Sequence, residues 1–149
     1  MRAVLQRVTQ TEVVVAGETV GQIGPGLLAF IGVAHGDTEA DAEHIAGKIA
    51  DLRLFDDADG AINRSLAEVG GAALLVSQFT LMGDCRRGRR PSWSDAAPPD
   101  EARRLYETVV ARVRARGITT QTGVFGAAMS VTLTNDGPVT VLLDSRRAF

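Results

Sequence analysis

The sequence predicts a single α/β domain in which two helices pack against a large mixed sheet. Three observations lead to this fold class. The 149 residues suffice for one hydrophobic core. The composition, 45% hydrophobic and 23% charged, is typical of a globular protein. Short apolar runs bounded by turn residues occupy both ends of the chain, and two segments with helical periodicity lie between them.

The N-terminal part of the chain reads as strands. Residues 2–8 lead into a second apolar stretch at 12–15, and a turn then reverses the chain into residues 19–23. A Gly-Pro-Gly turn at 24–26 follows. Residues 27–33 are apolar at consecutive positions, so they are expected to form a central strand that is buried on both faces.

Two later segments have the apolar spacing of helices. Asp37 or Thr38 can cap the first, in which apolar side chains recur every three or four residues between 42 and 52. The second begins at the prolines 98–99, carries an apolar stripe, and is expected to end at Gly117.

The remaining apolar runs complete the predicted sheet. A strand is expected at 72–76, and two closing strands, around 128–134 and 139–143, are expected to be joined at residues 135–138. The acidic segment 56–60 resembles the start of a twelve-residue calcium-binding loop. The downstream ligands and the glutamate at the twelfth position of such a loop are missing, however. A solvated turn is the better interpretation.

Several functional classes are disfavoured by composition. No apolar run is long enough for a membrane span, and charge returns at once within residues 1–7, so neither a membrane anchor nor a signal peptide is expected. The only cysteine, Cys85, cannot form an intramolecular disulfide, which suits a cytoplasmic protein. Because the net charge is −2, any binding of nucleic acid has to be local.

Two polar stretches at strand ends are the candidates for a site. The first is 77–80, and the second is 135–140. Neither contains a histidine, a cysteine or a pair of carboxylates, so an enzyme built on them works largely with main-chain groups and hydroxyls. The N–H groups of Phe79 and Thr80 are candidates for an oxyanion hole. The alternative interpretation is that this segment simply ends a strand and has no functional role. The carbonyls of Gly137-Pro138 suit an ammonium group, although a simple hairpin turn also remains open.

Other reactive side chains are scattered. His35 and His44 are interpreted as surface histidines and Cys85 as an incidental thiol, so no metal and no cofactor is expected. A basic cluster, by contrast, is compact and offers bidentate donors to phosphate, with a solvated loop as the alternative. It consists of Arg86, Arg87, Arg89 and Arg90.

Several motifs in the same order together resemble one family, the D-aminoacyl-tRNA deacylases, also called D-tyrosyl-tRNA deacylases. The resemblance covers about residues 1–144, and 145–149 form a tail beyond it. The matching segments are Met1–Val8, Gly24–Leu28, Ser77–Leu81, Gly88–Ser92, Asp95–Pro98, Thr122–Ala127 and Asn135–Thr140. The resemblance implies a homodimer with a three-layer α/β/β fold, formed by the single domain 1–149.

The resemblance also implies an activity and a site. The substrate is tRNA that carries a D-amino acid, or glycine mischarged on tRNA(Ala), and L-aminoacyl-tRNA is spared. The site is completed across the subunit interface, where a cis Gly137-Pro138 peptide from one subunit reaches the pocket of the other. The residues implied to line the pocket or bind substrate are Ser77, Gln78, Phe79, Thr80, Phe125 and Met129, with Arg7 bracing the Gly-Pro dipeptide.

Two alternatives remain at this point. One is a non-catalytic, nucleic-acid-binding homodimer that uses the four arginines of the cluster. The other is an esterase in which Thr80 is the nucleophile and forms an acyl-enzyme.

Overall fold

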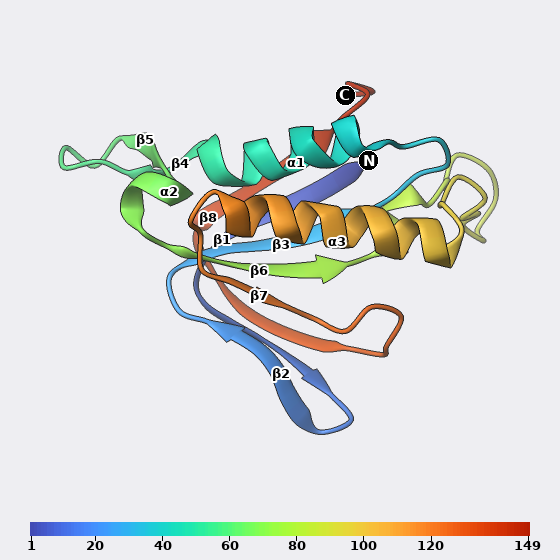
Figure 1. The fold of residues 1–149 in the computed structure, drawn as a ribbon, viewed down its shortest axis with the longest axis horizontal. Helices are drawn as coiled ribbons and strands as arrows, with labels where there is room; N and C mark the ends of the chain where they lie inside the picture. The colour runs from blue at the N-terminus through green and yellow to red at the C-terminus, as the bar shows by residue number, and fades with distance from the viewer.

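The computed structural model describes all 149 residues. Two helices, α1 (Glu39–Asp51) and α3 (Pro99–Ala115), lie side by side over one face of a strongly curled sheet (Figure 1). The strands of this sheet are β1 (Arg2–Val15), β2 (Glu18–Ile23), β3 (Gly26–Gly32), β6 (Ala72–Ser77), β7 (Thr120–Thr122) and β8 (Ser130–Asp144). The smaller elements are β4 (Arg53–Asp56), β5 (Ile62–Ser65), α2 (Leu66–Val69) and the 3₁₀ helix η1 (Phe79–Met82).

The sheet is mixed, as expected. Its strand order is β2-β1-β3-β6-β7, and β8 pairs with the other edge of β1. β1 is antiparallel to β2, β3 and β8, whereas β3, β6 and β7 run parallel to one another. The strands β4 and β5 form a separate hairpin. None of the helices is both long and apolar enough to cross a membrane.

The central strand β3 is buried on both faces, which confirms the interpretation of its continuous apolar run. Leu27 and Ile31 belong to the core beneath the helices. Leu28 belongs to a second core, together with Leu74 of β6 and Val13 of β1. Because the curled part of the sheet covers this second core, the helices and the two parts of the sheet form the expected α/β/β layers.

The predicted split of the closing strands is wrong. The strand β8 is continuous and pairs with β1 along its length, and the expected hairpin at residues 135–138 is instead a bulge. The register shifts there: Gln6 faces Thr140, whereas Val8 faces Asn135. The extra residues of β8 leave the ladder because Pro138 has no N–H to donate, and the long partner strand continues the sheet on both sides of them.

The turn expected at 56–60 is confirmed, and it connects two strands that the sequence did not reveal. The Asp57 carboxylate accepts hydrogen bonds from the backbone N–H groups of Asp59 (2.9 Å) and Ala61 (3.0 Å). This turn joins β4 to β5. Both strands have only four residues, which is too short for a recognisable alternation of apolar and polar side chains.

Candidate active site

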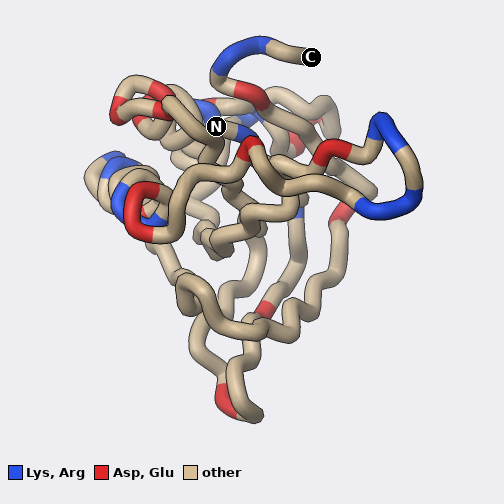
Figure 2. The backbone as a smooth tube through the Cα atoms, turned by 90° about the vertical axis from the view of Figure 1, so that its right-hand side faces the viewer, with Lys and Arg blue, Asp and Glu red and all other residues tan.

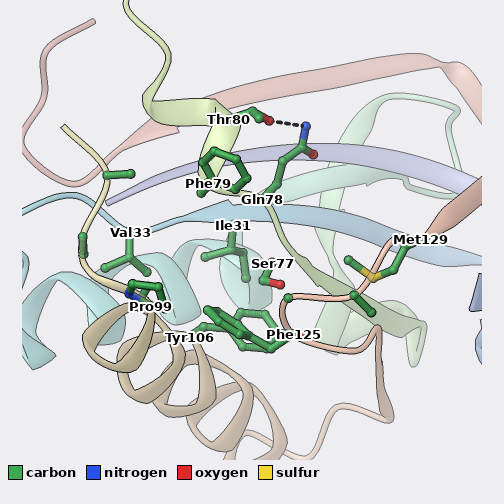
Figure 3. A pocket seen from close by; sticks show the side chains of 15 residues that line it. Ile31, Val33, Ser77, Gln78, Phe79, Thr80, Pro99, Tyr106, Phe125 and Met129 are labelled. Carbon is green, nitrogen blue, oxygen red and sulfur yellow. Dashed lines mark hydrogen bonds between the residues drawn. The ribbon is translucent and has the colours of Figure 1, made fainter. Parts of the chain in front are cut away.

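A pocket of about 460 Å³ opens where the end of β6, the start of α3 and the loop before β8 meet (Figure 3). Ten of the fifteen residues that line it are hydrophobic, so it is an apolar pocket with few polar groups. Six of its residues were candidates from the sequence: Ser77, Gln78, Phe79, Thr80, Phe125 and Met129. The other lining residues are Ile31, Val33, Ala96, Ala97, Pro99, Ala102, Tyr106, Gly126 and Ala127.

The segment from Ser77 to Thr80 passes from a strand into a 3₁₀ helix at the pocket. Gln78 N–H still donates to the carbonyl of Ile31 in β3 (2.7 Å), and the helix η1 begins at the next residue. The N–H groups of Phe79 and Thr80 belong to the first turn of this helix, where no intrahelical acceptor exists. Since both residues line the pocket, their N–H groups are candidate donors to a ligand bound there.

The polar side chains of this segment are joined to each other. The Gln78 side-chain amide donates to the Thr80 hydroxyl oxygen at 3.0 Å (Figure 3). An amide cannot take a proton from the hydroxyl, so this contact orients Thr80 without activating it as a nucleophile. Thr80 therefore has an oriented hydroxyl that is free to donate to a bound ligand.

The helix α3 supplies a pocket wall that was not among the candidates from the sequence. Tyr106 is the only lining residue with a titratable side chain, and its hydroxyl donates to the buried carbonyl of Leu75 (2.8 Å). Burial raises the pKa of this phenol, so Tyr106 stays neutral. Its ring lies 6.1 Å from that of Phe125, and the guanidinium carbon of Arg103 lies 4.7 Å from the Phe125 ring centre. A tyrosine within a helical apolar stripe was the signal that could have pointed to this wall.

Histidine, cysteine and carboxylate groups are absent from the pocket. His35, His44 and Cys85 do not line it, and Cys85 is an exposed free thiol. No group of three or more His, Cys, Asp or Glu side chains is placed to hold a metal ion. The arrangement can bind a polar group through main-chain donors and hydroxyls, but it offers no side-chain base.

Gly137 and Pro138 do not line this pocket. The peptide bond between them is cis, as expected, and both residues are exposed on the bulge of β8. The side-chain amide of Asn135 closes the bulge by donating to the carbonyls of Arg7 and Val139, both at 3.0 Å. Gly137 has a φ of +122°, a conformation that favours glycine.

Arg7 connects this bulge to β4. The side chain is buried, and its Nε donates to the carbonyl of Asp136 (3.3 Å) and lies 3.1 Å from the Asp136 carboxylate. Its Nη1 donates to the carbonyl of Leu54 (2.9 Å) and to the Asp56 carboxylate (3.1 Å). A guanidinium can satisfy all of these acceptors because its donors diverge in a fixed plane.

The four arginines of the basic cluster are not equivalent. Arg86 pairs with Asp84 through contacts of 2.7 and 2.8 Å, and these hydrogen bonds hold the pKa of the Asp84 carboxyl well below its usual range. The other three, Arg87, Arg89 and Arg90, are exposed and have no ion pair. They sit on a loop that projects from the body of the molecule (Figure 2).

The fold and the pocket together define an α/β protein whose candidate chemistry depends on main-chain donors and hydroxyls. A family model described as D-Tyr-tRNA(Tyr) deacylase matches residues 4–144. The D-aminoacyl-tRNA deacylase of Desulfitobacterium hafniense is 57% identical over 149 residues, all of both chains. That of Thermus aquaticus is 58% identical over 97% of this chain and 95% of its own. This chain therefore belongs to the D-Tyr-tRNA(Tyr) deacylase family.

A solved structure has the same fold. The protein described as c-Myc DNA unwinding element binding protein superposes with a TM-score of 0.91 at 36% identity, covering 97% of this chain and 98% of that one.

Proposed function

We propose that this protein hydrolyses the ester bond that joins a D-amino acid to the 3′-terminal adenosine of tRNA. The observation that carries the proposal is the pocket at the end of β6, where the Ser77–Thr80 segment offers main-chain donors and hydroxyls and no histidine, cysteine or carboxylate is present. An activated ester suits such a site, because it is more reactive than a peptide and needs less help from the protein. The family membership of the chain supports the same reaction.

In the proposed mechanism, water attacks the ester carbonyl carbon and the 3′-oxygen of the ribose leaves with a proton. The N–H groups of Phe79 and Thr80 donate to the oxyanion as negative charge develops on the carbonyl oxygen. A well-placed donor of this kind lowers the barrier by about 3–4 kcal/mol. Since the pocket has no base, the neighbouring 2′-hydroxyl of the ribose helps to remove the proton from water.

Chiral selection is proposed to come from a second copy of the chain. Gly137 and Pro138 are exposed and lie outside the pocket of their own chain, which suits a role in the pocket of a partner. Their carbonyls then accept from the α-ammonium of the substrate, and an L side chain would collide with this rigid wall, whereas a D side chain points away. Glycine has no side chain to exclude, so glycyl-tRNA, including glycine mischarged on tRNA(Ala), is also a substrate.

Two features of β8 support a homodimer. Its outer edge pairs with no strand of its own chain, and an unpaired edge of this length is a template for another copy. Leu142, near the end of this strand, is 60% exposed. The bulge with Gly137 and Pro138 lies on the same strand, so a partner that covers β8 also meets the dipeptide.

The direct test is the release of D-tyrosine from D-tyrosyl-tRNA by the purified protein, which we expect to act in the cytoplasm. The second candidate is a nucleic-acid-binding protein without catalysis, favoured by the description of the structural neighbour as a DNA-element binding protein. That candidate predicts strongly salt-dependent binding of tRNA without turnover. A Thr80 nucleophile predicts a burst of product and a trapped acyl-enzyme instead.

A further inference from the structure

Two large aromatic side chains are exposed at the edge of the pocket. Phe79 is 59% exposed and Trp93 is 41% exposed, and their ring centres lie 6.0 Å apart with an interplanar angle of 67°. Phe79 lines the pocket, whereas Trp93 does not. The pair therefore extends from the pocket outward along the surface.

Trp93 is held in place by the loop that precedes it. Asp84 and Ser92 exchange two backbone hydrogen bonds, of 2.7 and 3.0 Å, which close the base of this loop. The indole packs over Gly83, where a Cβ would lie only 3.3 Å from the indole Nε1. An aromatic ring that is fixed and still exposed has a rigid face available to a ligand at little entropic cost.

The same loop carries the basic residues that have no ion pair. The backbone hydrogen bonds between Asp84 and Ser92 close a short loop that ends next to Trp93. This loop contains Arg87, Arg89 and Arg90. They concentrate positive charge on one projecting loop of a protein whose net charge is −2 (Figure 2). Aromatic faces beside basic side chains are the usual combination for binding single-stranded nucleic acid.

We propose that Phe79 and Trp93 form a stacking platform for the nucleobase that precedes the terminal adenosine in the unpaired 3′ end of tRNA, with the three loop arginines contacting its phosphates. This inference rests on the proposed function, because the pocket has to hold the terminal aminoacyl-adenosine for the preceding nucleotide to reach Trp93. It assigns Trp93 to recognition of the nucleic acid strand and gives it no part in ester hydrolysis.

The first experiment compares two substrates, D-tyrosyl-tRNA and 3′-D-tyrosyl-adenosine, which lacks the preceding nucleotide. Trp93→Leu is expected to lower kcat/KM on the tRNA about 10-fold and to leave the adenosine substrate within twofold of wild type. Trp93→Phe, which keeps an aromatic face, is expected to recover most of the loss. If wild type hydrolyses both substrates and Trp93→Leu is unchanged on both, or equally impaired on both, the platform is overturned. If wild type hydrolyses neither, the proposed function itself fails.

The second experiment measures binding without catalysis. Trp93 is the only tryptophan, so its fluorescence reports directly on stacking. An uncharged RNA hairpin with an unpaired 3′ end is expected to quench this fluorescence, and a blunt hairpin to quench it much less. Replacing Arg87, Arg89 and Arg90 by Gln is expected to reduce the slope of log K against log salt by about 2. Arg53→Gln, an exposed arginine on β4, is the matched control and is expected to leave the slope unchanged.

Unchanged fluorescence on saturation with the overhanging hairpin would contradict the platform. So would fluorescence that changes only with protein concentration, because a second copy of the chain would then cover the aromatic pair.

Discussion

Replacing Gly137 by alanine tests whether the geometry of the β8 bulge matters. The φ of Gly137 is +122°, and holding a non-glycine residue in such a conformation costs about 1–3 kcal/mol. The new Cβ would lie 2.8 Å from Val139 Cγ2 and 3.0 Å from the Val139 backbone nitrogen. The Val139 side chain can rotate away from the new Cβ, but the Val139 backbone nitrogen cannot. Unless the bulge moves, overpacking therefore destabilises the fold further, by about 1–3 kcal/mol.

Gly60→Ala is the matched control. Gly60 also has a positive φ, +79°, but no heavy atom lies within 4 Å of its would-be Cβ in the turn between β4 and β5. Its cost is therefore the backbone contribution alone, about 1–2 kcal/mol.

The assays are urea unfolding at a fixed protein concentration and deacylation of D-tyrosyl-tRNA. Gly137→Ala is expected to be less stable than Gly60→Ala and to lose about 10²-fold in kcat/KM. In the proposed mechanism the Gly137 carbonyl contacts the substrate, and displacing such a group by about 1 Å has effects of this size. Gly60→Ala is expected to keep the activity of wild type. Equal stability and equal activity of the two variants would refute the reasoning.

Three further predictions concern the pocket and the first helix. Thr80→Ala should lower activity about 10-fold without abolishing it, and replacing the terminal 2′-hydroxyl by hydrogen should cost more; an acyl group trapped on Thr80 would contradict this. Deacylation should survive incubation with EDTA, and tightly bound zinc required for turnover would be the opposing result. Burial raises the pKa of Asp41, but hydrogen bonds from Ser145 and Thr38 outweigh it and lower the pKa to about 2. Asp41 should therefore stabilise the fold above pH 4 and less as the pH falls towards 2, so the urea midpoints of wild type and Asp41→Asn should converge over this range.

The parts of the fold that follow from local patterns could be predicted. The apolar run at 27–33 indicated a strand buried on both faces, and β3 contributes to both cores. The two helices follow from their apolar stripes and from signals at their N-termini. The continuity of β8 could not be predicted, because residues 135–138 have the composition of a turn and only pairing with β1 keeps the strand together.

The polar segment of the candidate site could be predicted from the sequence, whereas the residues of α3 that line the pocket could not. The segment Ser77–Thr80 ends an apolar strand with hydrogen-bonding side chains, which is a local signal. Tyr106 and Pro99 line the pocket from α3, and their place there depends on how the helix docks on the sheet. The neutralisation of Arg86 by Asp84 likewise requires the loop conformation, since the sequence shows four equivalent arginines.

The most direct test of the account is the rate of deacylation of D-tyrosyl-tRNA relative to L-tyrosyl-tRNA, measured with the same tRNA and the same enzyme preparation. In the proposed mechanism, a wall formed by Gly137 and Pro138 of a partner subunit rejects the L form by steric collision, so we predict a preference for the D form of at least about 10²-fold. Glycyl-tRNA is predicted to be hydrolysed as well. Comparable rates on D- and L-tyrosyl-tRNA would contradict the account.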